Sequence, residues 1–221
     1  MFSPDTWIIV QPIKPRGNLV TRGRKESGFS LVEAVVVIAI ILILAATAVV
    51  QIQPTLKAAK ANAALETTLG QLRQAHQSAV DLRRIYRVSF LPPRTIQIDQ
   101  VSYDSTGSQV FNFVSSIDLP NETQFVVVPG IPTASGTPDG LGTGQNAIDF
   151  SLDYGGGGTT VFFQKDGRAT DSAGRLNNGV VYIARPGELD SSKAVSVLGA
   201  SGRVKGWRLF DVNNSPEWRP L

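Results

Sequence analysis

The sequence predicts an α+β protein in which one long N-terminal helix packs on an antiparallel β domain. Residues 29–84 contain a single Pro and a single Gly, and apolar side chains in their second half recur at helical spacing. After residue 85 the spacing of apolar residues changes to two, as in strands. Most of the 21 Gly and 13 Pro residues lie beyond residue 90, in segments typical of turns.

Residues 1–28 form a basic, polar leader. They hold five basic and two acidic residues, whereas the rest of the 221-residue chain holds equal numbers of each. The formal net charge of +3 therefore belongs to the leader. It gives no support for binding of nucleic acid or anionic lipid by the body of the protein.

Residues 29–50 are the predicted transmembrane part of the helix. Only Ser30, Glu33 and Thr47 are polar among these 22 residues. As a helix the segment is about 33 Å long, close to one hydrocarbon thickness. A buried core helix would show a polar face, and a secretory signal would be followed by a cleavage site, so both alternatives fit less well. The preceding basic residues predict a cytoplasmic N-terminus and an external C-terminal domain.

Residues 51–84 are the predicted amphipathic half of the helix. Pro54 removes one backbone donor and is expected to kink the helix near residues 50–53 without ending it. The apolar stripe that should face the sheet follows spacings of three and four. It consists of Leu65, Leu69, Leu72, His76 and Ala79.

Residues 85–221 are the predicted β domain. Alternating apolar residues at 86–90 and 95–101 indicate two strands joined by a turn at Pro92-Pro93. The segment 129–144 is expected to be an exposed insertion or a contact between protomers. Further predicted strands are 109–114, 123–128, 146–152, 159–164, 179–184 and 194–198.

Glu33 is unusual because it lies inside the apolar run. A carboxylate at membrane depth is costly and is expected to have a partner. If a protease cut the chain after Gly28, Phe29 would gain a positively charged amine one helical turn before Glu33. The two charges could then pair within one chain or between neighbouring subunits, which suggests an assembly device.

The run Gly28-Phe29-Ser30-Leu31-Val32-Glu33 resembles the processing signature of type IV prepilins and type II secretion prepseudopilins. The resemblance implies cleavage after Gly28 and N-methylation of Phe29, both by a prepilin peptidase, and filament docking guided by Glu33. It also implies partners, namely other pilins or pseudopilins and an inner-membrane assembly platform. The chain would cross the inner membrane once, with its C-terminal domain in the periplasm.

The body of the chain resembles the minor-subunit family that groups H-type minor pseudopilins (GspH) with FimT-type minor pilins. The residues that carry this resemblance are 162–168, 194–197 and 201–205. It implies a minor pseudopilin of a type II secretion system, which drives protein export across the outer membrane. A type IV minor pilin for pilus assembly or DNA uptake is the main alternative, and a single-span anchored domain without a filament is a more distant one.

Gly202-Arg203-Val204-Lys205, followed by Trp207-Arg208, is similar to the Gly-Arg-x-Arg motif of FimT-type pilins in DNA uptake. In that interpretation Arg203, Lys205 and Arg208 contact phosphates beside an aromatic ring. Alternatively, the segment is a strand in which Arg203 and Lys205 share one solvated face. We favour the strand, so nucleic acid is not the expected partner.

No catalytic motif is present, because the sequence lacks a nucleophile elbow, a phosphate loop, a dinucleotide fingerprint and His-Glu-x-x-His. We therefore expect no enzyme activity and no cofactor. The chain has no Cys, and its only His is His76. Asp139, Asp149 and Asp153 match no calcium loop and are expected to be solvated acids, so no metal site is predicted.

Overall fold

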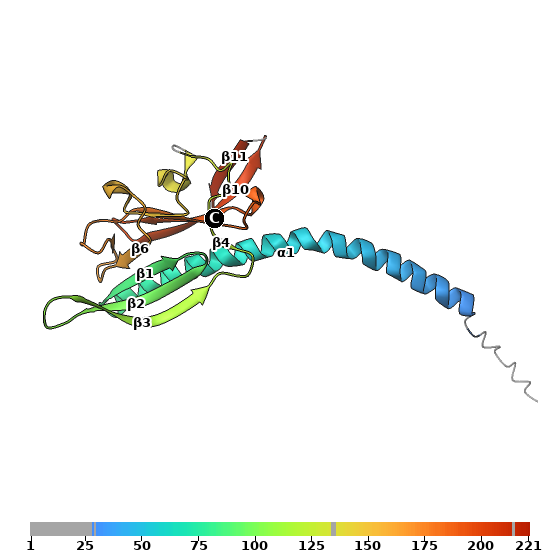
Figure 1. Ribbon diagram of the computed structural model, residues 1–221, viewed down its shortest axis with the longest axis horizontal. Coiled ribbons are helices and arrows are strands. Elements are labelled where there is room, and N and C mark those ends of the chain that lie inside the picture. Colours follow the sequence, from blue (N-terminus) through green and yellow to red (C-terminus); the bar gives the residue numbers. More distant parts are fainter. Residues whose placement is uncertain (1–27, 29, 134–135, 214) are drawn as a thin grey trace, which may run out of the picture. The chain divides into compact units, whose positions relative to one another are not determined.

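The chain divides into two compact units, Met1–Thr47 and Ala48–Leu221. Helix α1 (Leu31–Asp81) contributes to both (Figure 1). Pro54 lies inside the helix, so the proline does not end it, as predicted, and the expected kink stays a prediction. The computed structural model describes residues 28, 30–133, 136–213 and 215–221, without the side chains of residues 47–54.

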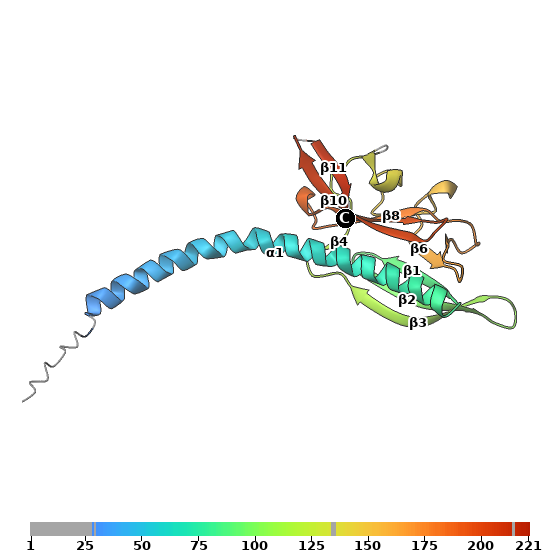
Figure 2. The same ribbon diagram turned by 180° about the vertical axis from the view of Figure 1, so that it is seen from behind.

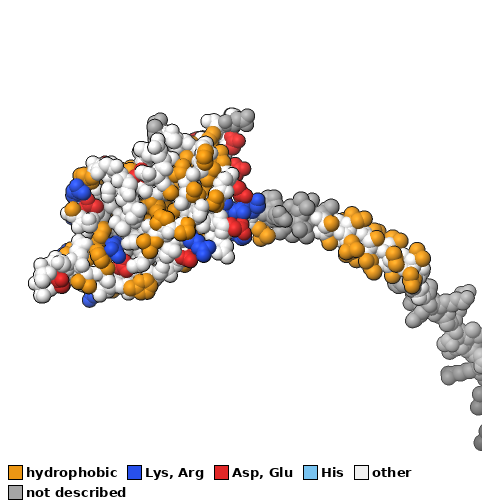
Figure 3. Space-filling model, viewed as in Figure 1, with side chains coloured by type: hydrophobic (Ala, Val, Ile, Leu, Met, Phe, Trp, Pro, Cys, Tyr) orange, Lys and Arg blue, Asp and Glu red, His pale blue; other side chains and the backbone are white. Residues whose placement is uncertain are grey.

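In the first unit, the described side chains of α1 are apolar apart from Glu33. The side chains of residues 31–46 are exposed, and orange apolar atoms cover the face of this segment that is seen in Figure 3. Within the described residues, no helix has the length and apolar character needed to cross a membrane. The predicted span at 29–50 includes Phe29 and the side chains of residues 47–50, which lie outside the described part.

In the second unit, α1 buries the predicted stripe. Leu65, Leu72 and Ala79 are fully buried, Leu69 is nearly so, and His76 is partly buried. The helix ends at Asp81, three residues before the predicted end at residue 84. Arg83 adopts a left-handed conformation with a φ of 52°, which turns the chain out of the helix and into the first strand.

The first sheet is antiparallel and has the strand order β3-β2-β1-β6-β7. Strands β1 and β2 form a hairpin around Pro92-Pro93, as predicted. Strand β3 is an edge strand, longer than predicted and largely exposed. The strands are β1 (Ile85–Leu91), β2 (Thr95–Tyr103), β3 (Gln109–Asp118), β6 (Thr160–Phe163) and β7 (Ala169–Thr170).

The second sheet has the order β11-β10-β9-β8-β4, and β5 also pairs with β8. Its pairings are antiparallel as well. Figure 2 shows β8 and β10 from behind, on the side of the domain away from β3. The strands are β4 (Gln124–Phe125), β5 (Ile148–Phe150), β8 (Gly179–Ala184), β9 (Lys193–Leu198), β10 (Arg203–Val212) and β11 (Ser215–Pro220).

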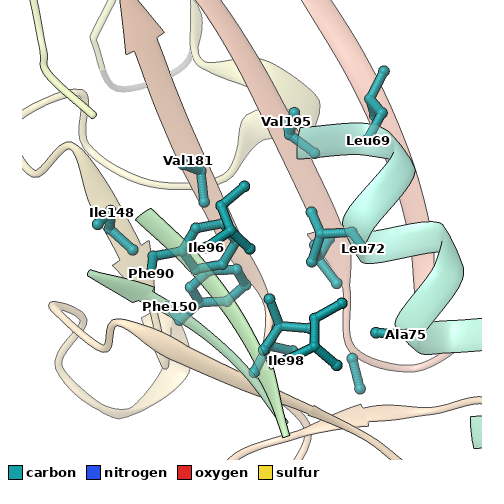
Figure 4. Packing of buried hydrophobic residues seen from close by; sticks show 14 of the residues in the cluster. Leu69, Leu72, Ala75, Phe90, Ile96, Ile98, Ile148, Phe150, Val181 and Val195 are labelled. Atoms are coloured by element: carbon teal, nitrogen blue, oxygen red, sulfur yellow. The ribbon is translucent and has the colours of Figure 1, made fainter. Parts of the chain in front are cut away.

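The main core lies between α1 and the inner faces of both sheets. Leu69 and Leu72 of the helix share one buried cluster with Phe90 and Ile98 of the first sheet and Val195 of the second (Figure 4). Each such side chain contributes roughly 1.5–3 kcal/mol by leaving water. This shared core confirms the α+β prediction of a helix packed on antiparallel sheets.

A second, smaller cluster covers the opposite face of the second sheet. Tyr182, Trp207, Leu209 and Trp218 form it together with Ile131, which belongs to the segment 129–144. Within the described residues of that segment, Pro138 is also buried. The expectation of an exposed insertion or a protomer contact is therefore wrong for these residues, because they pack on their own sheet.

Candidate functional site

The N-terminal motif, residues 28–33, spans the start of α1. Gly28 is exposed and lies before the helix, and Phe29 is outside the described residues. Ser30 is the capping residue, because its Oγ accepts the backbone N–H of Val32 at 3.2 Å and its carbonyl accepts that of Ala34 at 3.1 Å. The helix therefore begins directly after the predicted cleavage site.

Glu33 lies in the first turn of α1 and is exposed. In the part of the chain that the structure describes, its carboxylate has no partner. Ser30 and Glu33 have the Ser-x-x-Glu spacing of a capping box, but the Ser30 Oγ accepts the N–H of Val32 and not that of Glu33, so the described residues form no capping box. A carboxylate in the first turn also interacts favourably with the helix dipole, by typically 0.3–1 kcal/mol. Glu33 thus has a local stabilising role besides the predicted docking role.

Arg203 and Lys205 both face Asp139. The Arg203 Nη2 atom lies 3.3 Å and the Lys205 Nζ atom 3.7 Å from Asp139 Oδ1. The ammonium of Lys205 also lies 4.2 Å from the centre of the Trp207 ring. The two cations therefore share one face of β10, as predicted, and an acid from a distant loop lies between them.

Asp139 is held in place by a buried hydrogen-bond chain. Its Oδ2 accepts the hydroxyl of Ser196 at 2.5 Å, and the Ser196 Oγ accepts Nε1–H of Trp207 at 2.9 Å. Its side chain is only 16% exposed, so the expectation of a solvated acid is wrong here. Asp149 is also buried and accepts the N–H of Gly157 at 2.7 Å, whereas Asp153 is exposed as expected.

Arg208 lies on the opposite face of β10 from Arg203 and Lys205. Successive side chains of a strand point to opposite faces. Trp207 belongs to the outer cluster, whereas a Cβ on Gly206 would lie 2.8 Å from Leu69 of α1. The even-numbered positions therefore face the helix. The structure does not bring the three predicted DNA-contacting cations together.

Gly202, the first residue of the Gly-Arg pair, is required by packing. It has a φ of 62°, and an added Cβ would lie 2.2 Å from the Gly167 carbonyl oxygen and 2.8 Å from the His76 ring. The His76 Nε2 atom is 2.9 Å from the same oxygen, and its ring packs edge-on against Phe163. Two glycine turns and the end of α1 thus meet at one point, at the helix–sheet junction.

Two lysines of α1 form ion pairs with loops of the β domain. Lys57 contacts Glu188 at 2.9 Å, and Lys60 contacts Glu122 at 2.6 Å. The guanidinium of Arg185 contacts both acids. The hydrogen bonds from Lys60 and Lys57 hold the pKa values of Glu122 and Glu188 below their usual range. These helix cations are therefore already neutralised.

Among residues 28, 30–133, 136–213 and 215–221, no three His, Asp or Glu side chains come close enough to hold a metal ion. His76 is engaged with the Gly167 turn, as described above.

The N-terminal segment matches a family model described as the prokaryotic N-terminal methylation motif, over residues 23–49. The match contains Gly28, Phe29 and Glu33 and confirms the resemblance to prepilin-type proteins. The chain is thus pilin-like or pseudopilin-like at its N-terminus, and this similarity does not distinguish between the two.

Among solved structures, the chain is similar to the type IV minor pilin FimU of Pseudomonas aeruginosa, with 14% identity, a TM-score of 0.39, and coverage of 65% of this chain and 84% of that one. It is also similar to the minor pseudopilin EpsH from the Type 2 Secretion System of Vibrio cholerae, with 13% identity, a TM-score of 0.38, and coverage of 73% and 96%. No curated protein matches the chain. Both TM-scores are below 0.5, so the proposal below rests on the N-terminal motif.

Proposed function

We propose that this chain is a minor pseudopilin of a type II secretion system. A prepilin peptidase cuts it after Gly28 and methylates the new amine of Phe29. The mature subunit joins the periplasmic pseudopilus that drives protein export across the outer membrane. The observation that carries the proposal is the methylation-motif match over residues 23–49.

In this proposal residues 29–50 anchor the subunit in the inner membrane before assembly. The apolar, exposed side chains of residues 31–46 support an anchoring role. Glu33 pairs with the methylated amine of Phe29, in the same chain or in a neighbouring subunit. In an apolar environment these two opposite charges favour one alignment of neighbouring helices, because any other alignment leaves both charges unpaired. Partners are the assembly platform and the other filament subunits.

A type IV minor pilin is the second candidate, and the Gly202-Arg203-Val204-Lys205 motif is the observation that favours it. Two features argue against a DNA-binding role for this motif. Asp139 lies between the motif's two cations, and Arg208 faces the helix. A phosphate would have to displace a carboxylate that is already hydrogen-bonded to Ser196.

The first test is the mass of the mature N-terminus of the chain recovered from its host. The expected N-terminus is N-methylated Phe29. Replacing Gly28 with a bulkier residue, Gly28→Leu, should leave the leader attached, because the resemblance assigns Gly28 to the scissile bond. An intact leader on the unaltered chain would refute the proposal.

The second test separates the charge of Glu33 from the polarity of its side chain. Glu33→Val removes both, whereas Glu33→Gln keeps a polar side chain of the same size and removes only the charge. We expect both variants to be cleaved and both to fail to enter the filament. Normal incorporation of Glu33→Gln would show that the carboxylate is not the docking partner.

The third test distinguishes secretion from pilus function. Deletion of the gene should abolish export of type II substrates and leave pili and DNA uptake intact. The purified chain should not shift DNA at low salt. A salt-dependent shift that disappears in an Arg203→Ala/Lys205→Ala variant would favour the minor-pilin alternative.

A further inference from the structure

Three cations lie side by side on the helix-facing side of the second sheet. Arg208 of β10 is directly opposite Lys193 of β9 on one side and Arg219 of β11 on the other. Directly opposite residues of antiparallel strands share a face, with Cβ atoms about 5 Å apart, and like charges there are destabilising. We refer to Lys193, Arg208 and Arg219 as the cation row.

The inner end of the cation row is buried and forms no ion pair within the described residues. Lys193 is 6% exposed, and its ammonium reaches only the main-chain oxygens of Asp190 at 3.4 Å and Ser192 at 3.3 Å. The Nε of Arg208 is buried and has no hydrogen-bond partner. Burial, and then the charge of Arg208, lower the pKa of Lys193 to about 8, whereas Asp190 opposes this shift.

No carboxylate in the described part of the chain forms an ion pair with Lys193 or Arg208. The outer member of the row, Arg219, forms an ion pair with Glu217 at 3.5 Å, lies 5.8 Å from the centre of the Phe210 ring, and has a side chain that is 52% exposed. By contrast, Lys57, Lys60, Arg203 and Lys205 each have an acidic partner. Buried cations without an ion pair are costly, so Lys193 and Arg208 lack a component that these four cations possess.

We propose that the cation row binds an acidic side chain, Asp or Glu, of a partner protein that docks beside α1. The row becomes progressively deeper, from exposed Arg219 through partly buried Arg208 to buried Lys193. A flexible side chain ending in a carboxylate fits this gradient and can accept parallel N–H bonds from a guanidinium. A phosphate on a membrane or a nucleic-acid backbone stays at the surface and would reach Arg219 without reaching Lys193.

The description of this partner as a neighbouring filament subunit rests on the proposed function, whereas the anion site itself does not. The site lies in residues 193–219 and requires neither cleavage at Gly28 nor assembly. A chain that keeps its leader would refute the proposed function and leave the following binding experiment unaffected.

The probe is a fluorescent hexaglutamate peptide, with hexaglutamine as its control, added to the purified full chain in non-ionic detergent. We expect hexaglutamate to bind, and Lys193→Met and Arg208→Gln each to weaken binding about tenfold or more. Arg203→Gln and Lys205→Met are matched controls, because they remove the same charges from the opposite face of β10. Each control should change affinity by less than about twofold.

A structural role for Lys193 predicts a different result. If Lys193 only supported the fold, Lys193→Met would lower the melting temperature, whereas an unfilled anion site predicts that it raises the melting temperature while weakening peptide binding. Absence of hexaglutamate binding, or equal weakening by Arg203→Gln and Arg208→Gln, would overturn the proposal. Binding of phosphatidylglycerol vesicles or a single-stranded oligonucleotide through Lys193 and Arg208, without peptide binding, would overturn it as well.

Discussion

The two faces of β10 carry the same kind of charge in different environments. On the outer face, Arg203 and Lys205 are partly exposed and lie within 4 Å of Asp139. On the helix-facing side, Arg208 lies next to Lys193, and in the described residues neither has an acidic partner. The sequence Arg-Val-Lys-Gly-Trp-Arg does not reveal this difference, because both faces contribute basic residues.

This difference separates cations that stabilise the fold from cations that are available to a partner. The outer pair is tied to Ser196 and Trp207 through Asp139, so its charge holds the segment 129–144 on the sheet. Arg208 and Lys193, on the helix-facing side, tie no loop to the sheet within the described chain. A basic motif in a strand should therefore be divided by face before a ligand is assigned to it.

The largest effect should come from disturbing the glycine turn that leads into β10. Gly202→Ala places a Cβ 2.2 Å from the Gly167 carbonyl oxygen at a φ of 62°. We expect a loss of about 3 kcal/mol or more of unfolding free energy, from backbone strain and overpacking. Thermal unfolding followed by circular dichroism would measure it.

Gly174→Ala is the matched control for that change. Gly174 has a φ of 80°, but a Cβ there would meet nothing within 4 Å. Only the cost of the left-handed backbone should remain, about 1–2 kcal/mol. Equal destabilisation by the two variants would show that contact with His76 and Gly167 is unimportant.

The next effect concerns the inner face alone. Lys193→Met should raise the unfolding free energy by about 2 kcal/mol at pH 7, because it removes a buried cation without a counter-ion. Lys165→Met, at an exposed turn position, should change the stability by less than about 0.5 kcal/mol. Destabilisation by Lys193→Met would mean that the ammonium is already compensated.

The lowered pKa of Lys193 predicts that the stability of the fold depends on pH. Its pKa is about 8 in the folded chain, below the usual 10.5, because of burial and then the nearby charge of Arg208, with Asp190 acting in the opposite direction. The unfolded chain therefore binds more protons between pH 8 and 10.5, and stability should rise with pH across this window. The rise should be absent in Lys193→Met, so the difference between the two chemical-denaturation curves isolates it.

A smaller effect is expected on the outer face. Asp139→Asn keeps an acceptor for Ser196 but removes the negative charge beside Arg203 and Lys205, at a cost of about 1 kcal/mol. Asp153→Asn is the control, since that carboxylate is exposed and accepts one hydrogen bond from Asn178. Equal effects of the two changes in urea unfolding would contradict the role of Asp139.

The smallest expected changes in stability come from removing one arginine on each face of β10, and they should have opposite signs. Arg203→Gln removes a surface ion pair and should lower stability by about 0.5 kcal/mol. Arg208→Gln relieves repulsion from Lys193 and Arg219 and should raise stability by a similar amount. Changes of the same sign in a paired denaturation experiment would remove the distinction between the two faces.

Local patterns predicted most of the fold. The apolar stripe of α1 and the run that forms β8 (Gly179–Ala184) occupy the predicted positions. Strand β11 was missed because it contains Pro216 and Pro220, which an edge strand tolerates but which usually argue against a strand. Strand β10 was recognised only as a segment around Arg203 and Lys205, since charges on both faces conceal its alternation.

The candidate sites also differ in how far the sequence predicts them. Gly28, Phe29 and Glu33 form one contiguous motif, so they were visible in the sequence. Asp139 could not be placed beside Arg203, because 64 residues separate them and only the packing of a loop on the sheet joins them. The apolar run predicts a strand over 194–198, whereas the observed strand begins at Lys193, because nothing in the sequence shows that this normally exposed residue type is buried here.

The position of Ser30 has a consequence for the start of the helix in the proposed mature subunit. The first described hydrogen bonds of α1 run to the Ser30 carbonyl and hydroxyl, on the C-terminal side of the bond between Gly28 and Phe29. Removal of the leader at that bond would take none of these bonds from the helix. In the proposed function, the Ser30 cap of the anchoring helix is therefore the same before and after the leader is removed.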